Sequence, residues 1–318
     1  MLKFCVDEIV NRIENEKVAI KNRELISLCQ DYVRTLPQEV NPHIYHEIAE
    51  TALNVIIKKK YAQNLLNSPE PVKTVTEIIK PLAARLPTQT WRSREQTLLQ
   101  QFSTPPAIAY LLAYLLNLKS GEQILEPSAG TGSLAVWASG LGLKTHTNEI
   151  DSRRRELLEI LEFQPTAYNA EFINDFLCED VCADVLMMNP PFSSSGGRTV
   201  NNSSKFGFRH VSAALQRLKR GGKFGIILGE AAGLDTKTGN DFWREMARSV
   251  SVKVIIKIAG REYYKNGTSI DVTLTVGTKR LAEQTVDWRD ERQKIVSVVA
   301  ANVKDAFSIV SKFNLRLE

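Results

Sequence analysis

A short apolar run that ends in two prolines constrains the fold of this chain more than any other segment. Residues 184–188 read Asp-Val-Leu-Met-Met, and Asn189, Pro190, Pro191 and Phe192 follow directly. Such a run is typical of a buried strand in a parallel sheet. Each proline lacks an N–H and fixes φ near about −65°, so the strand has to end in a stiff turn. Because ligands bind at the carboxyl ends of strands in open α/β sheets, we expect this turn to line a ligand site.

The pattern around this run predicts an α/β sheet with helices on both faces. Strand-like apolar runs alternate with helical patterns from about residue 97 to residue 280, which is typical of a mainly parallel sheet. The last two expected strands flank Asn266-Gly267 and are predicted to form an antiparallel edge hairpin. The expected strands are residues 123–126, 144–149, 167–172, 185–188, 224–228, 252–258 and 270–276.

We expect the chain to divide into three parts. Helical periodicity dominates residues 1–95, which are predicted to form a small all-helical domain. Residues 96–283 form the predicted α/β domain with its catalytic site. Residues 284–318 are expected to form a tail of one or two amphipathic helices.

No group of cysteines or histidines predicts a metal site. Cys178 and Cys182 lack a second ligand pair nearby, and His43, His46 and Glu47 lack a further ligand. We interpret the second group as a solvated helix start. Four scattered cysteines are too few for a disulfide framework, which indicates a reduced, cytoplasmic setting. No apolar run approaches the roughly 18–20 residues needed to cross a bilayer, so no membrane partner is predicted.

The charge is unevenly distributed along the chain. Residues 193–318 carry 22 Lys and Arg against 12 Asp and Glu, whereas residues 91–192 carry 7 against 13. A basic part beside an acidic part indicates a polyanion that approaches from one side. The alternative is an uneven surface that is merely solvated.

A glycine-rich segment between the first strand and its helix indicates a loop close to a ligand. Glycines let the backbone approach a ligand and direct helix N–H groups toward it. Such a loop alone would equally suit NAD. Glu149, at the end of the second strand, is placed to bind a ribose diol. Asp175 follows the expected third strand and is either an acceptor for an adenine amine or a helix cap. The loop contains Glu126, Pro127, Gly130 and Gly132.

The Asn-Pro-Pro-Phe turn suits the activation of an aromatic amine. The lone pair of such an amine is delocalised into its ring, so the amine is a poor nucleophile. The side-chain oxygen of Asn189 and the carbonyl of Pro190 can each accept one amine hydrogen, and the prolines keep both acceptors rigid. Phe192 would stack on the base, which has to be flipped out of a duplex to reach the turn. Arg198 and Lys205, in the segment that follows, are expected to contact phosphate.

In this order, these segments resemble the gamma class of N6-adenine DNA methyltransferases, which includes the modification subunits of type I restriction systems. The Phe102-Ser-Thr104-Pro105-Pro segment ahead of the glycine loop is the most specific part of the match. The resemblance covers about residues 97–280. It implies a Rossmann-like catalytic domain, S-adenosylmethionine (SAM) as cofactor, and duplex DNA with a flipped adenine as partner.

The resemblance also implies roles for single residues. Phe102, Thr104 and Pro105 would surround the methionine part of SAM. Glu126 and Gly130, with Pro127 and Gly132 of the same loop, would lie near its amino end. Glu149 would bind the ribose and Asp175 the adenine. The catalytic residues would be Asn189, Pro190, Pro191 and Phe192, with the methyl group transferred in line to the amine that they hold.

One departure from the gamma class concerns target recognition. No separate recognition domain is evident in the residues after Val276. The N-terminal helices, a specificity subunit, or relaxed specificity would then set the target, and all three remain open. A prokaryotic enzyme of a plasmid or phage fits this economy. The alternatives are an RNA adenine or protein glutamine methyltransferase, a non-catalytic nucleic-acid-binding subunit with the same fold, and an NAD dehydrogenase.

Overall fold

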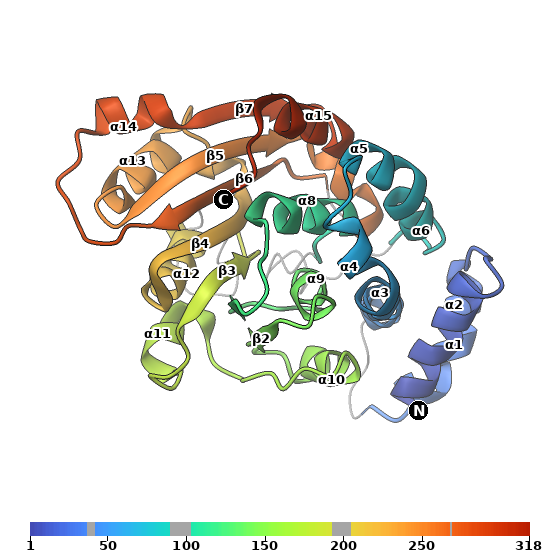
Figure 1. Cartoon of the computed structure of the whole chain (residues 1–318). Helices are drawn as coiled ribbons and strands as arrows, with labels where there is room; N and C mark the ends of the chain where they lie inside the picture. Colours follow the sequence, from blue (N-terminus) through green and yellow to red (C-terminus); the bar gives the residue numbers. More distant parts are fainter. Residues whose placement is uncertain (37–41, 90–102, 193–204, 268) are drawn as a thin grey trace.

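A computed structural model describes residues 1–36, 42–89, 103–192, 205–267 and 269–318 (Figure 1). Its centre is a seven-stranded mixed sheet with the strand order β2-β1-β3-β4-β6-β5-β7. The sheet and the helices that precede it confirm the predicted fold class. The strands are β1 (Gln123–Glu126), β2 (Lys144–Thr147), β3 (Ala183–Met188), β4 (Leu218–Gly229), β5 (Val250–Ile258), β6 (Val272–Lys279) and β7 (Val296–Ala300).

The strand directions divide the sheet into two parts. Strands β2, β1, β3 and β4 are parallel to one another, so their carboxyl ends share one edge. Strand β6 lies antiparallel between β4 and β5, which confirms the predicted hairpin. Strand β7 adds parallel to β5 on the outside of this hairpin. The prediction of a purely helical tail was therefore wrong at residues 296–300, because a short apolar run fits a strand as well as a helix.

The predicted strand at residues 167–172 was also wrong. Only an isolated bridge between Asn148 and Thr166 forms there, followed by the 3-10 helix η3 (Ala170–Phe172) and α11 (Ile173–Phe176). The Asn148 side chain bonds the neighbouring backbone: its Nδ2 donates to Tyr168 O (2.9 Å), and its Oδ1 accepts from Tyr168 N (2.8 Å). The Asn169 side chain then accepts from the Glu171 N–H and starts η3. These side-chain bonds compete with a strand ladder at this position.

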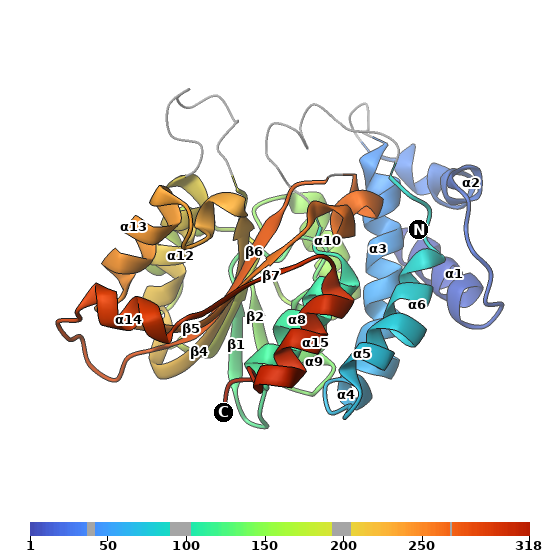
Figure 2. The same cartoon turned by 90° about the horizontal axis from the view of Figure 1, so that it is seen from above.

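Successive residues of β3 face opposite helical layers, as the apolar run at residues 185–188 predicts. Val185 and Met187 belong to the hydrophobic cluster that contains α8 and α15, whereas Leu186 and Met188 belong to the cluster of α12 and α13. Figure 2 shows these two layers on opposite sides of the sheet. The helices of the α/β part are α8 (Pro106–Leu116), α9 (Ala135–Ser139), α10 (Ser152–Ile160), α12 (Lys205–Gln216), η4 (Glu230–Ala232), α13 (Lys237–Met246), η5 (Gly260–Asn266), α14 (Trp288–Lys294) and α15 (Val303–Phe313).

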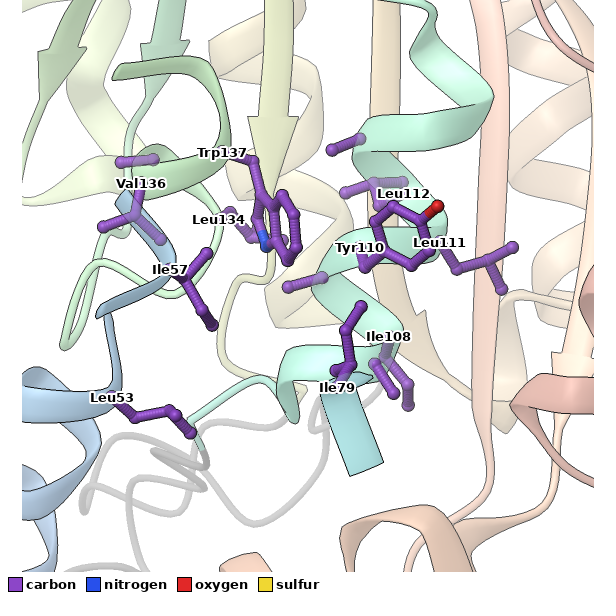
Figure 3. Packing of buried hydrophobic residues seen from close by; sticks show 14 of the residues in the cluster. Leu53, Ile57, Ile79, Ile108, Tyr110, Leu111, Leu112, Leu134, Val136 and Trp137 are labelled. Carbon is purple, nitrogen blue, oxygen red and sulfur yellow. The ribbon is translucent and has the colours of Figure 1, made fainter. Parts of the chain in front are cut away.

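The N-terminal residues are helical, as predicted, and pack against α9 and α10 (Figures 1 and 2). Leu53, Ile57 and Ile79 from these helices share one buried cluster with Tyr110 of α8 and Trp137 of α9 (Figure 3). The division into three domains stays a prediction. The N-terminal elements are α1 (Leu2–Glu14), α2 (Asn22–Val33), α3 (His43–Ile56), the π-helical η1 (Ile57–Tyr61), α4 (Ala62–Leu65), α5 (Pro71–Lys73), the π-helical η2 (Thr74–Ile79) and α6 (Lys80–Ala84).

The C-terminal helix is part of the core. The Phe307 ring of α15 is fully buried and lies 5.0 Å from the Tyr110 ring and 5.5 Å from the Tyr114 ring, centroid to centroid. The chain then pairs with α8, since Leu317 N donates to Leu115 O at 2.8 Å. Residues 303–317 therefore seal one face of α8.

We expect Phe307→Ala to lower the free energy of unfolding by about 3–5 kcal/mol, because it leaves a cavity against two tyrosine rings. Phe313→Ala is the matched control on the same helix, since this ring is 55% exposed and its loss is expected to change stability by less than about 0.5 kcal/mol. Urea unfolding of both variants measures the difference. Equal losses in the two variants would show that α15 does not seal the core.

Candidate active site

The carboxyl ends of three parallel strands bring the predicted site residues together. Glu126 is the last residue of β1 and lies in register with Thr147, the last residue of β2. Glu149 follows two residues later, and Asn189 follows directly after β3. Because β1 lies between β2 and β3, the three polar side chains follow neighbouring strands at one edge of the sheet.

The glycine-rich loop after β1 has the backbone conformation that its glycines permit. Gly130 has φ 55° and Gly132 has φ 83°, values that disfavour other residues. A Cβ on Gly132 would lie 2.7 Å from the Leu161 side chain, so this glycine also permits close packing. A Cβ on Gly130 would meet no described atom within 4 Å, which leaves room beside the loop for a ligand.

Glu149 is bonded to the glycine-rich loop. Its Oε2 accepts a hydrogen bond from Gly130 N (2.8 Å), and its Oε1 accepts one from Asp151 N (2.9 Å). The side chain is buried, and burial raises its pKa, whereas the charge of Arg154 and the two backbone bonds act in the opposite direction. The acid after β2 and the loop after β1 are thus one unit.

Glu126 is a buried carboxyl group at the end of β1. Among the described residues its Oε2 has no hydrogen-bond partner, and the residue is only 1% exposed. Burial, together with repulsion from Glu149, raises the pKa of Glu126 well above its ordinary value. Most buried polar atoms have a hydrogen-bond partner, so an unpartnered buried carboxyl oxygen with a raised pKa is a candidate for contact with a ligand. This oxygen fits a hydrogen-bond donor group of a ligand beside the loop.

The Asn189 turn is bonded to the segment that precedes α8. Asn189 Nδ2 donates to Thr104 Oγ1 at 2.9 Å, although the two residues are 85 positions apart. Directly before Thr104, Ser103 Oγ accepts a bond of 3.5 Å from Thr131 Oγ1 of the glycine-rich loop. Since the amide nitrogen of Asn189 faces Thr104, its oxygen is directed to the other side. One short segment therefore contacts both the turn and the loop.

Pro191 and Phe192 lie close to two glycines of neighbouring elements, of which Gly207 leaves room that a Cβ would fill. A Cβ on Gly229, at the end of β4, would lie 3.6 Å from the Phe192 ring. A Cβ on Gly207, in α12, would lie 3.1 Å from Pro191 O. Pro190 is buried, and the Phe192 ring is half-buried. The turn is therefore held from three sides by β3, β4 and α12.

Four predicted positions are placed differently or lie wholly or partly outside what the structure describes. Asp175 lies in α11, one residue before Phe176, whose ring stacks on Tyr168 with centroids 5.6 Å apart. Phe102 and Arg198 lie outside the described residues, and nothing is described of the Lys205 side chain.

The expectation of a solvated helix start at the beginning of α3 was wrong. His43, His46 and Glu47 are each at most 7% exposed. Glu47 Oε1 lies 2.7 Å from Arg154 Nε, and this ion pair compensates the loss of water around the buried carboxylate. Within the described part of the chain, no group of three acidic, histidine or cysteine side chains could hold a metal ion.

Two buried polar contacts next to the site were not predicted from the sequence: those of Arg154 and Asn54. Arg154 lies among three consecutive arginines, which conceals the one that is buried. Asn54 is 2% exposed on α3 and donates through Nδ2 to Thr131 O at 2.8 Å. The signal for Asn54 was present, since a single asparagine within an apolar helical run indicates a buried polar contact.

No helix that the structure describes is long and apolar enough to cross a membrane.

Comparison with known proteins points to one family. Residues 90–307 match the sequence model of the family described as N-6 DNA methylase. A curated relative, the tRNA (guanine(10)-N2)-dimethyltransferase of Methanothermobacter thermautotrophicus, is 28% identical over 127 residues, which are 38% of this chain and 37% of that protein. The match thus spans little more than a third of the length of this relative.

Two solved structures share the fold. One is a protein of Listeria monocytogenes assigned as a class I SAM-dependent methyltransferase, with a TM-score of 0.52 and 12% identity over 98% of this chain and 96% of that one. The other, from Vibrio vulnificus YJ016, is assigned as a modification subunit of a type I restriction enzyme, with a TM-score of 0.51 and 14% identity over 90% and 69% of the two chains. At these identities, the likeness concerns the fold alone.

We expect Glu126→Gln to raise the free energy of unfolding near pH 7. The raised pKa means that the folded state binds this proton more tightly than the unfolded state does. Wild-type stability therefore falls as the pH rises above the unfolded-state pKa of about 4.3, whereas glutamine does not titrate. Urea unfolding at several pH values should show a gain at pH 7 that narrows toward pH 4. The exposed Glu159→Gln is the control, and a gain independent of pH would contradict the prediction.

Proposed function

Because this chain belongs to the N-6 DNA methylase family, we propose that it transfers a methyl group from SAM to the N6 amine of adenine in DNA. The observation that carries the proposal is the Asn189–Thr104 hydrogen bond. It joins the turn that would hold the amine to the segment expected beside the methyl donor. The family match supports a methyltransferase, and the adenine amine of DNA as its acceptor is our inference.

The residues of the loop side fit the cofactor. We propose that Gly130 and Gly132 let the loop approach the methionine part of SAM, with Thr104, Pro105, Pro127 and Phe102 around it and Glu126 near its amino group. The open space beside Gly130 and the unsatisfied Glu126 oxygen support this assignment. Glu149 would accept hydrogen bonds from the ribose hydroxyls, and Asp175 one from the adenine amine. When bound, SAM supplies an electrophilic methyl group on a positively charged sulfur.

The residues of the turn fit an amine that is a poor nucleophile. The Asn189 oxygen and the Pro190 carbonyl would each accept one amine hydrogen, which favours a tetrahedral nitrogen with an available lone pair. Pro190 and Pro191 keep these acceptors in place before the reaction, so little ordering is needed during it. Thr104 fixes the orientation of the Asn189 amide. Phe192 would stack on the base after it has been flipped out of the duplex.

The proposed DNA substrate agrees with the basic C-terminal part of the chain, which carries an excess of ten positive charges in residues 193–318. We propose that a specificity subunit or the N-terminal helices supply target recognition. A second candidate is methylation of RNA, which the similarity to a tRNA methyltransferase favours. Protein glutamine is a further candidate acceptor, since its side-chain NH2 is also planar with a delocalised lone pair.

Transfer of the labelled methyl group from tritiated SAM decides among these substrates. We expect label in duplex DNA, and N6-methyladenine after digestion and mass spectrometry of its nucleosides. RNA and protein substrates are tested in parallel at equal concentrations. Label in RNA or protein but not in DNA would replace the proposed substrate, and the absence of SAM binding would contradict the proposed function altogether.

We expect Asn189→Ala to lower methyl transfer at least about 100-fold, because one of two acceptors for the amine is lost. SAM affinity should change much less, since Glu126 and Glu149, the proposed contacts to the amino group and the ribose, make no described bond to Asn189. Glu149→Ala should show the opposite pattern, with SAM binding weakened by the loss of the ribose contact. Calorimetry and transfer rates measure both properties. The exposed Asn67→Ala is a neutral control, and full activity in Asn189→Ala would overturn the proposed mechanism.

A further inference from the structure

A buried ion pair joins the N-terminal helices to the helix that follows Glu149. Glu47 of α3 and Arg154 of α10 are paired at 2.7 Å, with side chains 5% and 7% exposed. His43 Nε2, one turn earlier on α3, lies 3.3 Å from the same carboxylate oxygen. Burial disfavours both charges, but the pairing is stronger: the pKa of Glu47 is lowered and that of Arg154 is raised. Arg154 is therefore a fixed positive charge inside the protein.

The first turn of α10 also determines where the Glu149 carboxylate lies. Asp151 N donates to Glu149 Oε1 (2.9 Å), while Asp151 Oδ1 accepts from Arg154 N (3.2 Å) and caps the helix. Arg155 Nη1 donates to Glu149 O (2.9 Å) on the backbone of the same loop. Moving α10 would therefore move Glu149. The charge of Arg154 acts on this carboxylate as well, since it opposes the rise that burial causes in the pKa of Glu149.

The same helix α3 bonds the glycine-rich loop. Asn54 lies two turns after Glu47, so the two side chains share one face of α3. Its Nδ2 donates to Thr131 O (2.8 Å) and to Ser133 Oγ (3.4 Å), directly after Gly130 and at the start of the next helix. Figure 1 shows α3 beside α9 and α10. One face of α3 therefore contacts the loop after β1 and the helix after β2.

We propose that Arg154, held by Glu47 of α3, is a positioning residue that keeps Glu149 ionised and in place for the ribose of the cofactor. This inference rests on the proposed function, because it assigns Glu149 to the ribose. A carboxylate can accept hydrogen bonds from both hydroxyls of a ribose, whereas a protonated carboxyl group presents one fewer acceptor. The N-terminal helices would then contribute to cofactor affinity without touching the cofactor.

The proposal predicts a particular pH dependence of cofactor binding. The charged groups that face Glu149 are Arg154 and Asp151 from the α10 side and Glu126 from β1, with Glu47 and His43 of α3 behind Arg154. Binding should weaken as the pH falls and Glu149 takes up a proton. Removal of the Arg154 charge takes away one of the effects that oppose burial at Glu149, so the same weakening should begin at a higher pH.

Calorimetric titration with S-adenosylhomocysteine, the demethylated form of the donor, tests this between about pH 5 and pH 8. We expect Arg154→Met to weaken binding about 10- to 100-fold at pH 7 and to shift the pH profile upward. Arg154→Lys keeps the charge and should restore part of the affinity and most of the profile. In a Glu149→Gln background, Arg154→Met should lower the affinity for S-adenosylhomocysteine much less, because the two residues act as a pair.

The controls separate positioning from loss of the fold. Arg153→Met changes the preceding arginine, whose side chain is 38% exposed and pairs with Asp151 near the surface, and should leave the profile unchanged. Glu47→Gln combined with Arg154→Met avoids an unpaired buried carboxylate, and thermal melting checks its folding. An unchanged profile in Arg154→Met, or an equal loss with and without Glu149, would reduce Arg154 to a structural role and overturn the proposal. A wild-type chain that does not bind S-adenosylhomocysteine would instead contradict the proposed function.

Discussion

The site depends on the parallel pairing of β1 with β2 and β3, because it places three chain segments of different origin at one edge of the sheet. Parallel strands require crossovers, so each segment leaves the sheet in a loop at this edge and returns through a helix. The loops carry Glu126 with its glycines, Glu149, and Asn189. None of these residues needs the others in order to fold locally. Their proximity is a consequence of strand order, and it explains why the polar groups gather here rather than elsewhere on the sheet.

Several carboxyl groups are buried near this edge of the sheet, although burial of a carboxylate is unfavourable unless it is paired. Glu47, Glu126 and Glu149 are all buried, and of these Glu47 has a close ion pair with Arg154. A buried ion pair rarely stabilises a protein more than apolar side chains of the same size would. The presence of this one is therefore better explained by the arrangement that it imposes on α10 than by stability. Glu126 has no ion pair among the described residues and its Oε2 has no hydrogen-bond partner there, which fits a group that a ligand completes.

Much of the fold and of the turn could be predicted from the sequence, because apolar periodicity and paired prolines act locally. The strands at Gln123–Glu126 and Ala183–Met188 and the β5–β6 hairpin follow from such signals. The strand expected at residues 167–172 failed because Asn148, twenty positions away from Tyr168, takes over the backbone bonds of that segment. Strand β7 was missed because its short apolar run fits the periodicity of a strand as well as that of a helix. The burial of Glu47 depends on Arg154, 107 positions later, and no local pattern could indicate that pair.

The arrangement also assigns the two halves of the proposed reaction to different parts of the chain. The glycine-rich loop is bonded to α3 through Asn54. The helix after Glu149 is bonded to α3 through the Arg154–Glu47 ion pair. The Asn189 turn instead packs against β3, β4 and α12. Among the described residues, these elements do not take part in the Asn54 or Glu47–Arg154 contacts. The two sides meet at Ser103 and Thr104, which contact the loop and the turn respectively. A change in α3 should thus alter cofactor affinity more than it disturbs the amine acceptors, since the described side-chain bonds between the loop and the turn run through Ser103 and Thr104. This separation would let the helical part vary while the chemistry proposed at Asn189 stays the same.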